Sequence, residues 1–316
     1  MGPRVKPEDD SLGGSGNQRI EPGAGGWKQR AVTQFLQLVI FGIVSGGIIA
    51  LGAVGVSLLF GILRFANFAH GDMMTLGAYF ALVVVGPLAL PMALAFPMAL
   101  AATALAAVAI DQTLFRRLRR TAPVILLISS CGVALILRSV IQIVWGPDNV
   151  VYSPAIQLPW RVGDLRIRPT HVMILAITIG LVVLLHLFLQ YTRMGKAMRA
   201  MSDEPDLARV TGINTEAVVV WTWIVGGSLA AAAGIFLGMD TRLNPLIGWN
   251  ILLPVFAAAL LGGIGKPYGA IAGGFIIGIA TEVSTMFMEP VYKPAVAFAL
   301  IVILLIVRPT GLMRGK

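Results

Sequence analysis

The charged stretch at residues 191–214, YTRMGKAMRAMSDEPDLARVTGIN, limits the possible folds of this chain more than any other feature. Its ionic side chains belong to Arg193, Lys196, Arg199, Asp203, Glu204, Asp206 and Arg209. Each would cost about 2.5–3.5 kcal/mol at the centre of a membrane helix, yet long apolar segments flank the stretch on both sides. The stretch therefore lies in water, and its excess of basic residues near the flanking segments places it in the cytosol.

Within this stretch, the pattern predicts one short helix over 194–201. The sequence Asp203-Glu204-Pro205 starts a second helix, which Gly212 ends. Such a helical elbow is either a plain connector or a docking surface.

The composition is that of an integral membrane protein. Of the 316 residues, 57% are hydrophobic and 12% are charged, and the mean hydropathy is +0.85, whereas soluble domains are about 45–50% apolar. The net charge of +9 is explained by basic cytosolic loops and does not indicate nucleic-acid binding. The single cysteine, Cys131, excludes a disulfide framework and a cysteine-based zinc site.

Two domains are predicted. Residues 1–30 are rich in Gly and Pro and have no apolar face to bury, so we expect a disordered tail. Residues 31–316 form a single transmembrane domain. We expect an all-α fold with about 8–9 hydrophobic segments, at 33–63, 73–86, 88–110, 123–145, 171–189, 215–239, 249–265, 269–288 and 290–307.

The topology depends on the basic clusters. Arg116, Arg117, Arg119 and Arg120 mark the cytosol, Arg308, Arg314 and Lys316 hold the C-terminus inside, and residues 146–170 then face outward. Three full spans before Arg116 would place the N-terminus outside. Because Lys28 and Arg30 favour the inside, we prefer a half-crossing near Asn67 to an external tail. Arg138 is expected to extend to the outer headgroups.

Two interruptions of the apolar pattern predict broken or re-entrant helices near 65–75 and 258–270. In the first, Asp72 is expected to cap a helix that begins at Met73. Glu282 lies deep in a later span and is expected to pair with a polar neighbour. Paired interruptions in two halves of a chain are typical of a transport path. The candidate pathway or gating residues are Asn67, His70, Asp72, Gly262, Gly263, Gly265 and Glu282.

The sequence indicates no energy source or catalytic centre of its own. The run Gly262-Gly263-Ile264-Gly265-Lys266 lacks the spacing of a phosphate-binding loop, and Pro267 stands where a hydroxyl residue would bind Mg²⁺. The histidines at 70, 171 and 186 have no metal-ligand spacing. We therefore expect a transporter and not an enzyme, with no metal and no cofactor in this chain. An ion-coupled carrier would have only Asp72 and Glu282 as membrane carboxylates.

Four motifs resemble the LivH-type permeases of branched-chain amino acid ABC importers. They are ANFAHGD at 66–72 with Gly77-Ala78-Tyr79, YTRMGKAMRA at 191–200 with Gly212-Ile213-Asn214, LGGIG at 261–265 and RPTGL at 308–312. The resemblance runs from about residue 33 to the end. Permeases for urea and short-chain amides look similar, and they remain the alternative, together with an ion-coupled secondary carrier.

The resemblance implies a multi-pass subunit of the bacterial inner membrane that translocates branched-chain or related small amino acids. Its implied partners are a LivM-like second permease, two cytosolic ATPases that use the ATP, and a soluble solute-binding protein. Residues at about 192–212 would form the loop that docks into the ATPase, with 202–211 as its helix. The implied coupling residues are Arg193, Gly195, Arg199, Asp203, Ala208, Gly212 and Asn214.

Overall fold

The computed structural model describes residues 24–119, 121–152, 158–307 and 311–312. Most of the predicted tail lies outside these residues, as do Arg120, Arg308, Arg314 and Lys316. Helix α1 (Ala24–Leu63) already includes residues 24–30, so this part of the expected disordered tail is helical.

Among the described residues, the regular structure is helical apart from one short β-hairpin and an isolated bridge between Val150 and Leu243, which confirms the all-α prediction. The next elements are α2 (Ala69–Val85), α3 (Met92–Ile110), the π-helical turn Asp111–Phe115, α4 (Arg116–Leu118) and α5 (Pro123–Trp145). The antiparallel strands β1 (Trp160–Val162) and β2 (Leu165–Ile167) follow, with Trp160 opposite Ile167. The chain continues through α6 (Pro169–Tyr191), α7 (Arg193–Asp203), α8 (Pro205–Val210) and α9 (Thr215–Asp240). It closes with α10 (Ile247–Gly262), α11 (Pro267–Val283), 3₁₀ turns at Ser284–Met286 and Pro290–Tyr292, and α12 (Lys293–Val307).

Among the described residues, seven helices are long and apolar enough to cross a membrane. The apolar helices α2 and α10 are shorter. Both predicted interruptions are present, since α1 breaks off before α2 at residues 64–68 and α10 breaks off before α11 at residues 263–266.

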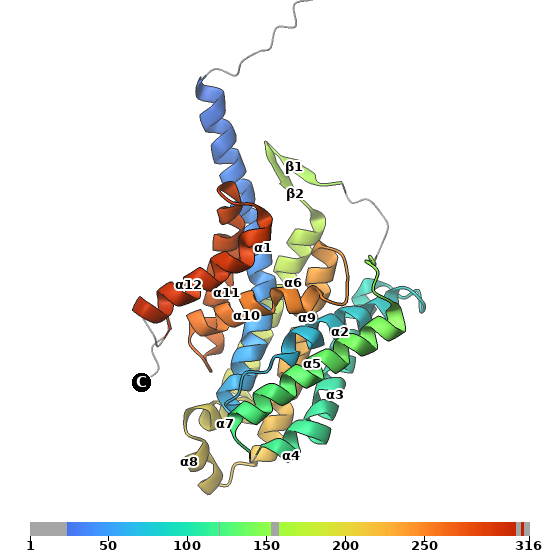
Figure 1. Cartoon of the computed structure of the whole chain (residues 1–316), viewed down its shortest axis with the longest axis vertical. Helices are drawn as coiled ribbons and strands as arrows, with labels where there is room; N and C mark the ends of the chain where they lie inside the picture. The colour runs from blue at the N-terminus through green and yellow to red at the C-terminus, as the bar shows by residue number, and fades with distance from the viewer. Residues whose placement is uncertain (1–23, 120, 153–157, 308–310, 313–316) are drawn as a thin grey trace, which may run out of the picture.

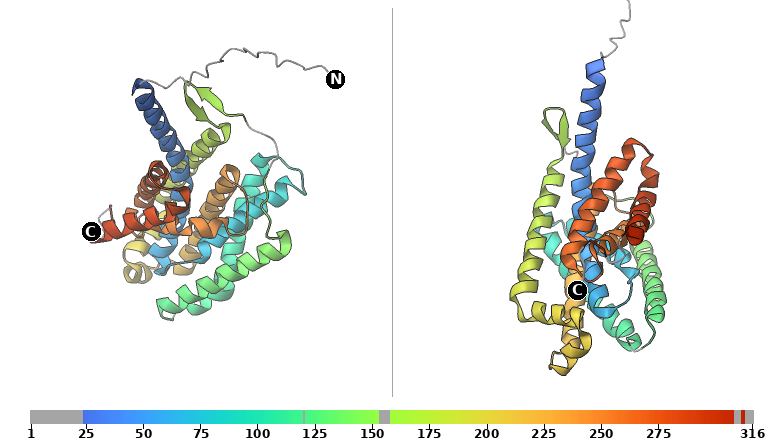
Figure 2. Two further views of the ribbon diagram at one scale, coloured as in Figure 1. Left: turned by 45° about the horizontal axis from the view of Figure 1, so that its top comes forward. Right: turned by 90° about the vertical axis from the view of Figure 1, so that its left-hand side faces the viewer.

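The charged helices α7 and α8 lie at one end of the molecule, and the start of α1 and the β-hairpin lie at the other (Figures 1 and 2). If α7 and α8 lie in the cytosol, as the sequence predicts, the start of α1 lies on the external side. Alternation would then require α2, which is shorter than the seven candidate spans, to cross from inside to outside, an arrangement that disfavours the preferred half-crossing near Asn67. Arg64 donates a hydrogen bond to the Ser202 carbonyl of α7 at 3.0 Å, whereas Tyr152 beyond the outer end of α5 donates to the Ala78 carbonyl at 2.9 Å. The segment between Arg64 and Ala78 thus runs from the inner to the outer end.

Glycines bring the central helices into backbone contact, which is how small residues favour helix association in membranes. A Cβ atom on Gly278 of α11 would lie 2.3 Å from the Cα atom of Gly46 in α1. One on Gly234 of α9 would lie 1.8 Å from the Met74 carbonyl oxygen in α2. Both glycines are therefore required for the close packing of α1 on α11 and of α2 on α9.

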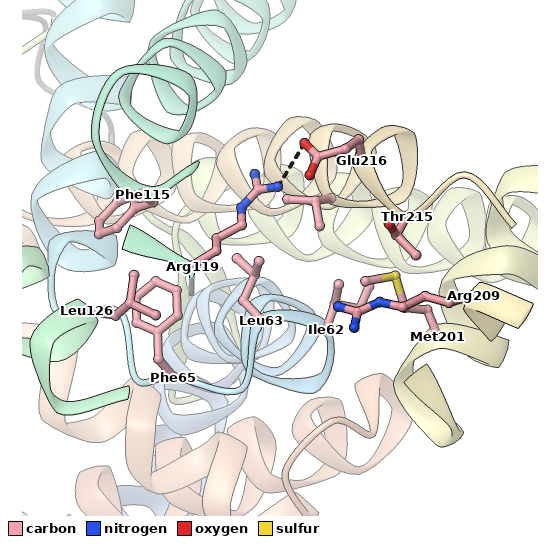
Figure 3. Close-up of a pocket in the computed structure, with 11 residues that line it drawn as sticks. Ile62, Leu63, Phe65, Phe115, Arg119, Leu126, Met201, Arg209, Thr215 and Glu216 are labelled. Carbon is pink, nitrogen blue, oxygen red and sulfur yellow. Dashed lines mark hydrogen bonds and ion pairs between the residues drawn. The ribbon is translucent and has the colours of Figure 1, made fainter. Parts of the chain in front are cut away.

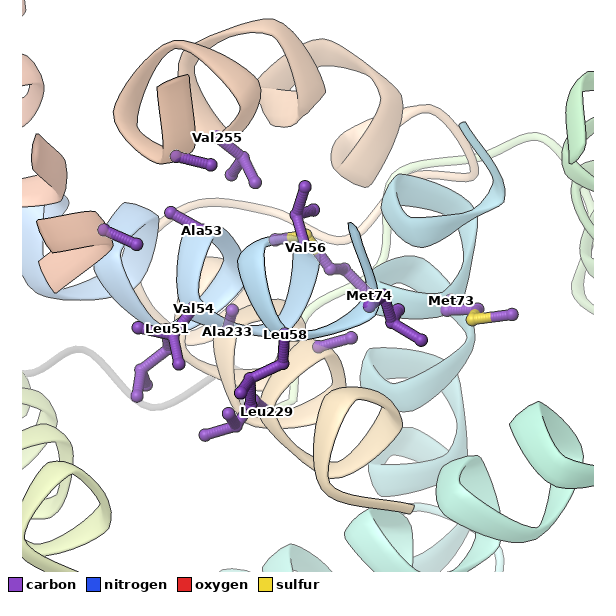
Figure 4. Packing of buried hydrophobic residues seen from close by; sticks show 14 of the residues in the cluster. Leu51, Ala53, Val54, Val56, Leu58, Met73, Met74, Leu229, Ala233 and Val255 are labelled. Atoms are coloured by element: carbon purple, nitrogen blue, oxygen red, sulfur yellow. The ribbon is translucent and has the colours of Figure 1, made fainter. Parts of the chain in front are cut away.

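The core surrounds the middle of α1, with buried side chains of α2, α9 and α10 packed against it (Figure 4). Leu51 and Val54 of α1 are buried, as are Met74 of α2 and Val255 of α10. At the α7–α8 end, Trp223 of α9 stacks on Phe115 with ring centroids 5.3 Å apart. This core fixes the positions of the two interruptions, which both adjoin α1.

Candidate functional site

A buried ion pair joins α2 to α5 in the middle of the bundle. The guanidinium group of Arg138 donates through Nε to Oδ1 of Asp72 and through Nη2 to Oδ2, both at 3.1 Å. The Asp72 side chain is 0% exposed and that of Arg138 is 14% exposed. The guanidinium carbon also lies 4.6 Å from the ring centroid of Trp249 in α10. One bidentate pair and one cation–π contact therefore hold three helices together.

This pair corrects two predictions. Asp72 does not cap a helix beginning at Met73, because α2 already begins at Ala69 and the carboxylate points to Arg138. Asn67, just before the helix, instead satisfies the first backbone N–H of α2, since its Oδ1 accepts from Ala69 at 3.1 Å. Arg138 does not extend to the headgroups, because the buried carboxylate provides a stronger partner than the outer surface does.

The imidazole ring of His70 packs against α1 at Gly55. It is fully buried, and a Cβ atom on Gly55 would lie 2.7 Å from its Cε1 atom. Asn67 is also buried. Nearby, the Ser130 hydroxyl of α5 accepts from the Phe68 backbone N–H at 3.0 Å. The first interruption thus brings together the predicted residues Asn67, His70 and Asp72.

The second interruption packs against the end of α1, next to the last turn of α7. A Cβ atom on Gly61, near the end of α1, would lie 2.9 Å from the Gly265 Cα and 2.9 Å from the Ser202 hydroxyl oxygen. Gly262 packs on the backbone of Gly269, and Gly263 ends α10. The end of α7 therefore lies against both interruptions, so a movement of the elbow would displace both of them.

The elbow consists of two short helices. Thr192 caps α7 by accepting from the Gly195 N–H at 2.9 Å, and Asn214 caps α9 by accepting from the Ala217 N–H at 3.0 Å. Gly212 ends α8 with φ +83°. The expected helix at 202–211 is wrong, because α7 continues to Asp203 and a separate helix starts at Pro205. Proline lacks a backbone N–H and fits the first turn of a helix, not its interior.

The implied coupling residues divide between the surface and the interior of this elbow. Gly195 and Ala208 are buried and serve packing. The exposed ones are Arg193, Arg199, Asp203, Gly212 and Asn214. Two apolar side chains of α8 are exposed as well, with Leu207 at 59% and Val210 at 81%. These two residues were not predicted as functional. Apolar side chains in a short helix of a charged segment do, however, indicate a contact surface.

A small cavity of about 130 Å³ lies between this elbow, the end of α1, the segment that follows α3, and the first turns of α5 and α9 (Figure 3). Arg119 lies across it and donates to Glu216 at 3.0 Å and also to the buried carboxylate of Asp111. Met201 and Arg209 contribute the elbow side of the cavity. Arg116 and Arg119 of the basic cluster, predicted only as a cytosolic marker, thus also tie the segment after α3 to Glu216 of α9.

At the opposite end, two adjoining cavities of about 240 and 470 Å³ share the side chains of Ser45, Asp240, Glu282 and Lys293. We call them together the outer vestibule. Glu282 has the polar neighbours expected for it, since its Oε1 accepts from Lys293 at 2.6 Å and from the Ser45 hydroxyl at 3.2 Å. His171 Nε2 lies 2.9 Å from Asp240 Oδ1.

The predicted pathway residues therefore do not form one cluster. Asn67, His70 and Asp72 lie around the start of α2, the glycines at 262–265 lie beneath α7, and Glu282 lies at the far end of α11. Their roles in a pathway remain predictions. His186 is exposed, and its Nδ1 lies 2.8 Å from the Tyr268 hydroxyl oxygen. Within the described ranges, no three His, Cys, Asp or Glu side chains gather as a metal site would need.

Comparisons with known proteins give one consistent result. A family profile described as branched-chain amino acid transport system / permease component matches residues 38–305. The high-affinity branched-chain amino acid transport system permease protein LivH of Escherichia coli is 32% identical over 293 residues, which cover 88% of this chain and 95% of the relative. The corresponding protein BraD of Pseudomonas aeruginosa is 30% identical, with 89% and 96% covered.

Among solved structures, PsaBC from Streptococcus pneumoniae in complex with Fab matches with a TM-score of 0.50 and 14% identity. The match covers 87% of this chain and 92% of that chain, and at this identity it supports the fold alone. The sequence relatives carry the assignment. The chain therefore belongs to the family of permease components of branched-chain amino acid transport systems.

Proposed function

We propose that this chain is the permease subunit of an ABC importer that translocates branched-chain amino acids across the bacterial inner membrane. A soluble binding protein delivers the solute from outside, and separate cytosolic ATPases supply the energy. This chain itself carries no cofactor and no catalytic site. The family relationship and the seven long apolar helices support a multi-pass permease.

The exposed apolar tip of α8 is the observation that most favours coupling to a separate ATPase. Leu207 and Val210 project from a segment that lies in water, which is unfavourable unless a partner covers them. Behind them, α7 contacts both interruptions through Ser202. A partner that moves α8 would therefore shift the ends of α1 and α10. Its effect must come from different contacts with the inward-open and outward-open states.

Uptake into proteoliposomes tests this function directly. We expect leucine uptake only when the permeases are reconstituted with the ATPases, the binding protein and ATP. The purified chain alone, under a proton or sodium gradient, is expected to give no uptake. Gradient-driven uptake by the single chain would overturn the proposal in favour of a secondary carrier. ATP-driven uptake of urea or acetamide without leucine would assign the substrate to the alternative class.

The exposed face of α5 favours a second permease, LivM-like, as a partner. Most of its exposed residues are apolar, but Ser139 and Gln142 are exposed in the outer part of a membrane span. By contrast, the exposed residues of α12 within the span are apolar, such as Phe298 and Ile303. Polar side chains in a lipid-exposed position are unfavourable, whereas at a helix interface or beside a water-filled path they find partners. We infer that α5 faces the second permease.

Cysteine cross-linking checks this face. In a Cys131→Ser background, Ser139→Cys labelled with benzophenone-4-maleimide, whose photoreactive end needs no thiol on the partner, is expected to cross-link to the second permease. Val183→Cys on α6, which is 51% exposed, is the matched control and is expected to give no such product. Cross-linking from Val183 and none from Ser139 would place the partner elsewhere.

A further inference from the structure

The outer vestibule combines opposite charges with an apolar wall, a combination that the packing of the bundle does not require. Its larger cavity, of about 470 Å³, is in the range of about 300–1,000 Å³ typical of small-molecule sites. Ile49, Ile247 and Ile251 contribute to its apolar wall, and Arg242, Asp240 and Glu282 to its charged part. The cavity lies at the end opposite to α7 and α8, where solute enters an importer.

The charges of the vestibule are only partly neutralised. Among the residues that the structure describes, the guanidinium group of Arg242 has no ion-pair or hydrogen-bond partner. Asp240 and Glu282 each use one carboxylate oxygen, toward His171 and toward Lys293 and Ser45 respectively. Among the described residues, the second carboxylate oxygen of Asp240 and that of Glu282 have no hydrogen-bond partner. Within the same part of the chain, the guanidinium group of Arg168 in the smaller cavity likewise has no ion-pair or hydrogen-bond partner, so the vestibule offers two guanidinium groups and two free carboxylate oxygens to a ligand, and Arg242 is the guanidinium group in the larger cavity.

We propose that the outer vestibule is a binding site for a zwitterionic amino acid with an apolar side chain. Arg242 takes the carboxylate in a bidentate pair, the free oxygens of Asp240 and Glu282 take the ammonium group, and the isoleucines contact the side chain. This site deepens the function proposed above and rests on it. It gives the permease a selection step of its own after the binding protein releases the solute.

Direct binding tests the site without the binding protein. The probe is radiolabelled leucine, added to the purified complex of permeases and ATPases and measured by scintillation proximity. We expect Arg242→Gln to weaken leucine binding at least tenfold and Arg242→Lys to weaken it less. Leucinamide, which lacks the carboxylate, and 4-methylpentanoate, which lacks the ammonium group, are expected to compete at least tenfold more weakly than leucine.

Arg166→Gln is the matched control. Arg166 is an exposed arginine on the same side of the molecule, in β2, and does not line the vestibule. It is expected to leave leucine binding unchanged. Equal binding by wild type and Arg242→Gln, or no leucine binding by wild type at millimolar concentration, would overturn the site. Failure of the importer function would differ, because the wild-type complex would then show no ATP-driven leucine uptake even with its binding protein.

Discussion

Replacing Arg138 by glutamine is expected to destabilise the protein by about 3–5 kcal/mol, the usual cost of leaving one member of a buried ion pair without its partner. The reason is the Asp72 carboxylate, which is 0% exposed and makes both of its short contacts with this guanidinium group. A glutamine amide would leave the negative charge uncompensated between α2 and α5. Unfolding of the purified protein in mixed detergent micelles, followed by Trp fluorescence, measures the change.

Two further variants show whether the unpaired charge is the cause. The double variant Asp72→Asn with Arg138→Gln removes both charges and is expected to recover most of the lost stability. Arg116→Gln breaks an exposed pair with Glu216, whose two side chains are 54% and 55% exposed, and is expected to cost about 0–1 kcal/mol. If Arg138→Gln cost no more than Arg116→Gln, the pair would have no structural importance.

The same pair shows where sequence reasoning stops. Local signals identified the interruption at 64–68 and the polar character of Asp72, because charges and glycines in an apolar run are visible directly. The partner of Asp72 lies 66 residues away, and no local pattern links the two. Both Asp72 and Arg138 were therefore assigned the best local alternative, a helix cap and a headgroup contact. Tertiary packing provided a stronger partner for each.

In the elbow, by contrast, local sequence rules predicted the structure better than the family resemblance did. Local chemistry predicted a break at Asp203-Glu204-Pro205, and the structure ends α7 at Asp203 and starts α8 at Pro205. The family resemblance instead implied one helix at 202–211, which is wrong. Here the physical rule on proline was the better guide. The β-hairpin at 160–167 was missed because two three-residue strands in a polar loop leave little periodicity to read.

The outer vestibule could be predicted only in part. Glu282 stood out because an acidic residue deep in a span needs a partner. Lys293 did not stand out, because it fell inside the last predicted span. Arg242 and Asp240 fell at the edges of loops, where charge is unremarkable. Only the fold shows that α1, α9, α11 and α12 bring these side chains to one cavity.

Introducing glutamate at both Leu207 and Val210 is expected to abolish co-purification of the ATPases and to lower ATP-driven uptake at least tenfold. These side chains, 59% and 81% exposed, would have to lose water in a docked state, and two carboxylates in an apolar contact are strongly unfavourable. Both point away from the core, so the fold and the membrane insertion should be unchanged. Affinity purification of the complex and uptake into proteoliposomes measure the two effects.

Leu158→Glu is the control for adding charge to an exposed leucine. Leu158 is 80% exposed and lies before the β-hairpin at the opposite end of the molecule, so ATPase co-purification should be retained. Normal co-purification and uptake by the Leu207 and Val210 variant would show that α8 is a plain connector. In that case Ser202 of α7 would still contact Gly61 and Gly265, but the ATPases would not act on the permease through α8. The expected loss of both readouts would instead make α8 the docking element and α7 the element that carries its movement to the two interruptions.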